Sequence, residues 1–170
     1  MSEGAIYLKI TARDDKRYWL KLAVSPSTKL TALDELLRST WLECCGHLSA
    51  FSTPGRQGTD VNANLSVGTV FNRVTALDYV YDFGSSTELI IKRVKSAPTI
   101  ARGITLLGRN EQPPESCEEC GTPATSICSE CSLDRGGLYC DEHSAEHQCG
   151  EEFLLPVVNS PRMGVCGYGG

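Results

Sequence analysis

Eight residues of metal-binding types are concentrated between positions 117 and 149, with the spacing C-x2-C-x7-C-x2-C-x8-C-x2-H-x3-H-x-C. Zinc takes four Cys or His ligands in a tetrahedral site, and a C-x2-C pair on a tight turn directs two sulfurs at one ion. Eight ligands therefore predict two zinc ions in closed sites, which hold structure rather than perform catalysis. The predicted ligands are Cys117, Cys120, Cys128, Cys131, Cys140, His143, His147 and Cys149.

Two other uses of these cysteines fit the sequence less well. Disulfides belong to oxidising compartments, and the first residues, MSEGAIYLKITARDD, lack the apolar stretch of a secretory signal. An iron–sulfur cluster usually takes four Cys, whereas here six Cys come with two His. We therefore expect a cytoplasmic, zinc-binding protein.

The sequence leaves open which ligand pairs share an ion. A cross-brace is the common arrangement for four successive pairs, in which the first and third pairs hold one ion and the second and fourth hold the other. The first site would then consist of Cys117, Cys120, Cys140 and His143. The second would consist of Cys128, Cys131, His147 and Cys149.

This segment resembles B-box zinc fingers, and more loosely AN1 and MYND fingers. The match rests on C-x2-C-G at 117 to 121, Ala124, the second C-x2-C, Leu138 before Cys140, and the two histidines, and it covers about a fifth of the chain. B-boxes usually end on a more distant His, so Cys149 is a departure. The resemblance implies a module that binds other proteins.

The charge is divided unevenly along the chain. Residues 1 to 103 contain 13 Lys and Arg against 10 Asp and Glu, whereas residues 104 to 170 contain 3 against 11. Nucleic-acid affinity rests largely on basic side chains that neutralise phosphates. The acidic finger therefore argues against nucleic acid and favours a protein partner. No run of 18 apolar residues occurs, so we expect no membrane span.

The first hundred residues predict an α+β domain. Alternating polarity predicts strands at 5 to 12, 18 to 24, 47 to 51, 77 to 83 and 88 to 94. A helix is expected between the second and third strands, with Thr31 and Asp34 as its capping box and one apolar face formed by Leu33, Leu36, Leu37 and Trp41. The order β-β-α-β-β-β indicates a mixed sheet with one main helix, and it suits a β-grasp-like layout.

We predict four successive parts. These are a core domain at 1 to 103, a connector at 104 to 116 that contains Pro113-Pro114, the finger at 117 to 149, and a glycine-rich tail at 150 to 170.

Two motifs of the core domain carry a second resemblance. WLECCGHLSAF at 41 to 51 and YVYDFG at 79 to 84 are similar to the plasmid Ri open-reading-frame-three-like family, passenger proteins of an insertion element. The similarity covers roughly residues 5 to 95. It implies a fold more than an activity, since most members have no known biochemical function. Relatives continue after YDFG with Asp, Trp and His at alternating positions, where this chain has Ser85, Thr87 and Leu89.

Other reactive residues have structural explanations that we prefer. Cys44 and Cys45 could join His47 on a metal, but adjacent side chains leave a helix about 100° apart, so core cysteines are favoured. Asp82 and Glu88 flank a predicted hairpin turn and could form a carboxylate pair. Cys166 has no partner among the eight predicted ligands.

Three functions therefore remain for the chain. The first is a non-enzymatic, zinc-binding protein-interaction module, with a link to mobile elements implied by the second resemblance. The second is an enzyme or processing factor of a mobile element, with a site at His47, Asp82 and Glu88. Nucleic-acid binding through the N-terminal half is the weakest.

Overall fold

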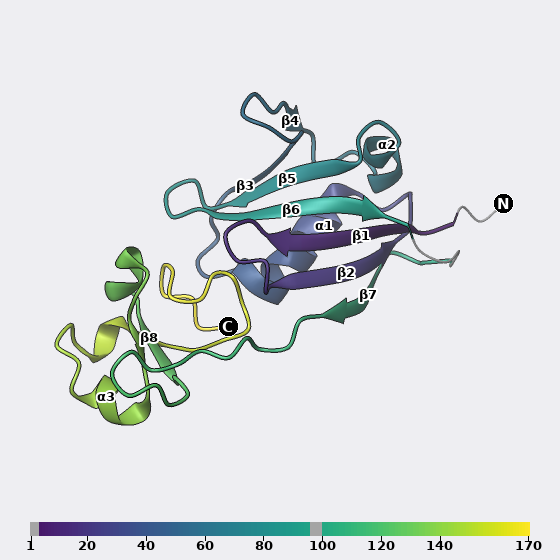
Figure 1. Cartoon of the computed structure of the whole chain (residues 1–170). Helices are drawn as coiled ribbons and strands as arrows, with labels where there is room; N and C mark the ends of the chain where they lie inside the picture. The colour runs from purple at the N-terminus through teal and green to yellow at the C-terminus, as the bar shows by residue number, and fades with distance from the viewer. Residues whose placement is uncertain (1–3, 96–99) are drawn as a thin grey trace. The chain divides into compact units, whose positions relative to one another are not determined.

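The computed structural model describes residues 4–95 and 100–170, and the chain divides into two compact units. The first unit consists of Met1–Thr40 and His47–Asn110 (Figure 1). The second consists of Trp41–Gly46 and Glu111–Gly170. A short segment at the end of the main helix is therefore grouped with the C-terminal third of the chain.

An antiparallel sheet of seven strands builds the first unit, in the order β4-β3-β5-β6-β1-β2-β7. Every pairing between these strands is antiparallel, both within the consecutive pairs β1–β2, β3–β4 and β5–β6 and between them. The α+β class is confirmed. We expected a sheet with both parallel and antiparallel pairs, but all of its pairs are antiparallel. The strands are β1 (Ile6–Ala12), β2 (Trp19–Val24), β3 (Ser49–Ser52), β4 (Asp60–Val61), β5 (Ala76–Tyr81), β6 (Thr87–Val94) and β7 (Ile104–Arg109).

The core of this unit lies between the sheet and helix α1 (Leu30–Leu37), which crosses one face of the sheet (Figure 1). Alternate side chains of the strands point to this face, and Leu8, Ile10 and Leu22 have no exposed surface. Leu33 and Leu37 of the helix are equally buried. Every second side chain of the strands and every third or fourth side chain of the helix thus pack in a common apolar layer.

Helix α1 begins differently from our prediction. Its N-cap is Lys29, whose side chain makes no capping hydrogen bond, so Thr31 and Asp34 do not form a capping box. Instead, the amide of Leu30 donates to the carbonyl of Leu65, and the amide of Thr31 donates to that of Ala63. A distant loop therefore satisfies the first-turn amides that a helix leaves without internal partners.

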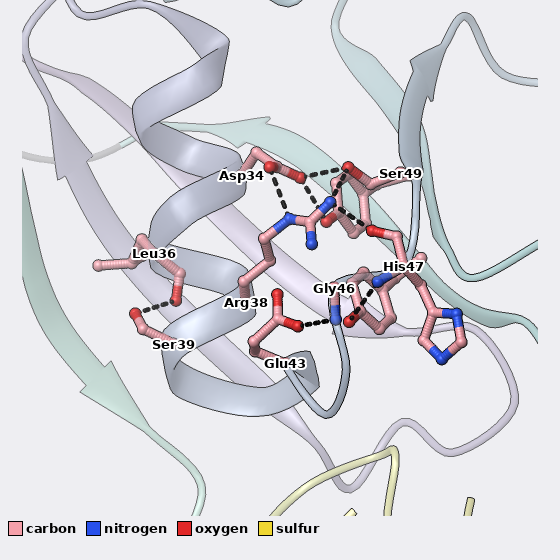
Figure 2. Close-up of polar contacts among 10 residues, drawn as sticks. Asp34, Leu36, Arg38, Ser39, Glu43, Gly46, His47 and Ser49 are labelled. Atoms are coloured by element: carbon pink, nitrogen blue, oxygen red, sulfur yellow. Dashed lines mark hydrogen bonds and ion pairs between the residues drawn. The ribbon is translucent and has the colours of Figure 1, made fainter. Parts of the chain in front are cut away.

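Asp34 does not cap the helix but connects α1 to the sheet through hydrogen bonds (Figure 2). Its carboxylate accepts hydrogen bonds from Tyr79 Oη and Ser49 Oγ, both at 2.6 Å, and from Arg38 Nε at 2.8 Å. Arg38 also donates to the carbonyl of His47 at 2.8 Å. Burial, and then the hydrogen bond to Asp34, raise the pKa of Tyr79 well above its ordinary value, so the phenol stays a donor.

The helix continues as a π-helical turn at Arg38–Leu42, and the chain then bends at Cys44 and Cys45. A second helix, α2 (Val67–Phe71), follows β4 in the chain. Ser66 is its N-cap and accepts a hydrogen bond from the amide of Thr69 at 3.2 Å.

The second unit contains a small sheet of three strands, in the order β10-β8-β9. These are β8 (Ser126–Cys128), β9 (Leu138–Tyr139) and β10 (Leu154–Pro156), so a strand from the predicted tail completes the sheet of the finger. Short helices η2 (Cys131–Asp134), α3 (Asp141–Ala145) and η3 (Glu151–Phe153) connect and follow them.

We expect Asp34→Asn to lower the free energy of unfolding by about 1.5–3 kcal/mol, the cost of weakening charge-assisted hydrogen bonds in a half-buried site. Chemical denaturation of the full chain, followed by a signal from the sheet, measures this. Asp15→Asn is the matched control, because Asp15 pairs with Arg17 at the surface and such pairs contribute about 0–1 kcal/mol. Equal effects of the two changes would contradict the role given to Asp34.

Candidate metal centres

The first four-ligand group contains Cys117, Cys120, Cys140 and His143, whose ligand atoms all lie within 4.8 Å of one another. The two N-terminal cysteines lie on a turn in which the amide of Gly121 donates to the carbonyl of Cys117 at 2.9 Å. Cys140 is the N-cap residue of α3, and His143 lies within that helix. The turn and the start of the helix therefore present their ligands to one point.

The second group contains Cys128, Cys131, His147 and Cys149, again within 4.8 Å of one another. Cys128 ends strand β8, and Cys131 begins helix η2. His147 and Cys149 follow α3. The structure thus brings the eight residues together in the two sets that a cross-brace arrangement requires.

The distances between ligand atoms are those of tetrahedral coordination. With metal–sulfur bonds of about 2.3 Å and metal–nitrogen bonds of about 2.05 Å, two sulfurs lie about 3.8 Å apart, and sulfur lies about 3.6 Å from nitrogen. The Sγ atoms of Cys120 and Cys140 are 3.8 Å apart, and so are those of Cys131 and Cys149. A disulfide would need about 2.05 Å.

The sulfur–nitrogen pairs agree with the same geometry. His143 Nδ1 lies 3.5 Å from Cys117 Sγ and 3.3 Å from Cys140 Sγ. His147 Nε2 lies 3.5 Å from Cys131 Sγ. Each group could therefore hold one metal ion with four protein ligands.

Backbone amides favour the thiolate form of the first cysteine in two of the pairs. Burial raises the pKa of the Cys117 thiol, but the amides of Cys140 and Cys120 outweigh this effect and lower it to about 6. Burial also raises the pKa of the Cys128 thiol, but hydrogen bonds, chiefly from the amide of Cys131, outweigh it and lower the pKa to about 7. Since metals bind the thiolate, these turns prepare the sulfurs for coordination.

Neighbouring side chains orient other ligands. Thr122 Oγ1 lies 3.1 Å from Cys120 Sγ, at hydrogen-bonding distance. The ring of Tyr139 lies beside that of His147, with centroids 4.4 Å apart. Such outer contacts fix the direction of a ligand before the metal arrives.

The second set of candidates lies in the first unit, where the two carboxylates contact different partners. Glu88 forms an ion pair with Arg13, with 2.7 Å between Oε2 and Nε. Asp82 has a backbone φ of 64°, and its Oδ1 accepts a hydrogen bond from the amide of Gly84, so it shapes the hairpin turn. His47 Nε2 lies 3.5 Å from Asp82 Oδ2.

Sequence reasoning missed the polar cluster around Asp34. Asp34 and Tyr79 are 45 positions apart, and no local pattern connects them. The available signal was a single acidic residue beside the apolar helix face, which we assigned to capping.

No protein-family model matches the chain, and no curated protein matches it in sequence. Among solved structures, it is similar to the crystal structure of a protein of unknown function from Methanosarcina mazei Go1. The two share 16% sequence identity and a TM-score of 0.53, over 72% of this chain and 76% of that chain. The likeness is one of fold alone. Within the described residues, no helix has the length and apolar character needed to cross a membrane.

We expect Cys131→Ser to unfold the finger and release its metal, since the site loses a thiolate and the small core has little else to hold it. Elemental analysis gives the metal content, and hydrogen exchange reports the finger and the large sheet separately. The large sheet should keep its protection. Ser116→Ala, an exposed change beside Cys117, is the control and should leave both measurements unchanged. A folded, metal-free finger would contradict this prediction.

Proposed function

We propose that this chain is a zinc-binding protein without catalytic activity, and that its finger at residues 117 to 149 binds another protein. The observation that carries the proposal is the pair of four-ligand groups, each complete without solvent. A metal with four protein ligands has no open position for water or substrate, so it acts on structure.

Zinc suits these groups better than other metals. Six thiolates with two imidazoles form a soft, mixed ligand set, and the tetrahedral spacing described above is the one that zinc adopts in structural sites. Two zinc ions are therefore the proposed cofactors.

The surface of the finger favours a basic partner. Residues 117 to 149 contain seven Asp and Glu but one Arg. A hollow of about 510 Å³ lies beside the two histidine ligands, and Glu119 and Glu146 line it. Acidic walls around a hollow complement Lys or Arg side chains of a partner protein. The resemblance to B-box fingers leads to the same proposal.

For the first unit we propose membership of the plasmid Ri open-reading-frame-three-like family, and with it a link to mobile elements. The sequence motifs at 41 to 51 and 79 to 84 support this proposal, and the α+β fold is compatible with it. An enzymatic role at His47, Asp82 and Glu88 is the less favoured alternative, because Glu88 is held by Arg13 and Asp82 by the turn.

One observation favours nucleic-acid binding as a second candidate. Lys21, Lys9 and Lys92 lie directly opposite one another on three neighbouring strands, and all three are exposed. Like charges in facing positions destabilise a sheet, so this row of lysines is compatible with an anionic ligand. The row is short, and the chain as a whole is acidic.

We expect capture of a partner to depend on the acidic hollow. The intact chain and a Glu119→Gln, Glu146→Gln variant would be immobilised, and bound proteins quantified by mass spectrometry. The double variant should lose most of the captured partner while retaining its zinc. Glu151→Gln with Glu152→Gln removes the same charge from residues that do not line the hollow, and it should have no effect. Equal capture by both variants would overturn the proposal.

We expect weak, salt-sensitive binding to DNA. The formal charge is −5, and six thiolates on two zinc ions contribute −6 + 4 = −2, which gives about −7. A row of three lysines limits the slope of log affinity against log salt to about −3. Titration at several salt concentrations measures both quantities. Tight binding above physiological salt that disappears when Lys9, Lys21 and Lys92 become Gln would favour the second candidate.

A further inference from the structure

Three cysteines outside the finger bring their sulfur atoms together within the second unit. Cys45 Sγ lies 3.6 Å from Cys44 Sγ and 3.7 Å from Cys166 Sγ. The ligand atoms of this cluster lie within 4.8 Å of one another, as in the two groups of the finger. These separations are close to the value of about 3.8 Å for two sulfurs on one tetrahedral ion.

Adjacent cysteines can converge here because the helix ends before them. The π-helical turn stops at Leu42, and the chain bends at Cys44 and Cys45. The amide of Gly46 then donates to the carboxylate of Glu43, which closes the bend (Figure 2). The angular separation that we expected from a continuing helix does not apply. Cys45 is also exposed, so it is not the core cysteine that we predicted.

The tail presents Cys166 in a strained conformation. Its φ of 50° lies in the left-handed region, which costs a residue other than glycine about 1–2 kcal/mol. Gly164, at a φ of 78°, allows the close approach of Ile127, whose Cδ1 would lie 2.8 Å from an added Cβ. Ser132 Oγ donates to the carbonyl of Gly164 at 3.0 Å. With these contacts, the tail places Cys166 beside Cys45.

A buried cation adjoins the cluster. Arg162 has no exposed surface, and its Nη2 lies 3.4 Å from Cys44 Sγ. Its amide donates to Ser160 Oγ, which in turn donates to the carbonyl of Trp41 at 2.6 Å. Guanidinium keeps its charge in proteins, so Arg162 places a positive charge beside these sulfurs. Three thiolates on a divalent ion carry −3 + 2 = −1, which one guanidinium neutralises.

We propose that Cys44, Cys45 and Cys166 bind a third zinc ion, which fastens the C-terminal tail to the bend that follows the π-helical turn. Thiolates are soft ligands that suit zinc. Three cysteines leave one coordination position open on a tetrahedral ion. This site uses none of the eight ligands of the finger, so it does not depend on the proposed function.

Alkylation of the full chain tests the site directly. Cys45 and Cys166 are exposed, so a maleimide should label them quickly unless a metal holds their sulfurs. We expect peptide mapping to show protection of all three cysteines in zinc-loaded protein. A chelator should remove the protection, and a phosphine reductant should not. Immediate labelling, or protection that the reductant removes, would overturn the proposal, since the latter outcome indicates a disulfide.

Metal content separates this site from the finger. We expect three zinc ions per chain, falling to two in both Cys166→Ser and Cys45→Ser, with hydrogen exchange of the finger unchanged. A content of two that neither variant alters would overturn the third site and leave the two-zinc finger standing. One zinc ion per chain that is absent from Cys166→Ser but present in Cys131→Ser would support the third site and refute the two-zinc finger.

Discussion

The second unit packs around clustered sulfur atoms. The buried cluster around β8 and β9 consists of eight side chains, of which five are predicted cysteine ligands and three are Tyr139, Phe153 and Leu154. So small an apolar core cannot offset the conformational entropy of ordering the chain around it. Within the second group, the thiol of Cys131 resists ionisation, whereas that of Cys128 does not. Burial, with Cys128 and Cys149 close by, raises the pKa of Cys131 to about 11.

The first unit is stabilised by a different kind of contact. Its sheet and α1 share a continuous apolar layer, and the polar cluster at Asp34 fixes the helix against β3 and β5. Such a cluster selects one position of the helix, because a shifted helix would leave the carboxylate of Asp34 and the phenol of Tyr79 without these partners. Apolar packing and side-chain hydrogen bonds therefore hold the helix of this unit against its sheet.

Features set by neighbours in the sequence were predictable. The strands at 6–12, 19–24 and 87–94 follow the alternation of polar and apolar residues, and ligand spacing indicated two groups of four. Features set by distant residues were not. The first turn of α1 takes its partners from Ala63 and Leu65, so local capping rules misplaced the role of Asp34. A solitary Cys166 carries no signal until the fold brings it to Cys45, 121 positions away.

The two units present charges of opposite sign, and this limits what the chain can bind. The finger places carboxylates around a hollow beside its histidine ligands, whereas Lys9, Lys21 and Lys92 line up on the first unit. A uniformly anionic ligand such as DNA is attracted by the lysine row but repelled by the acidic finger. The acidic hollow is complementary to basic groups, whereas the lysine row is complementary to acidic ones, so the two features select ligands of opposite charge.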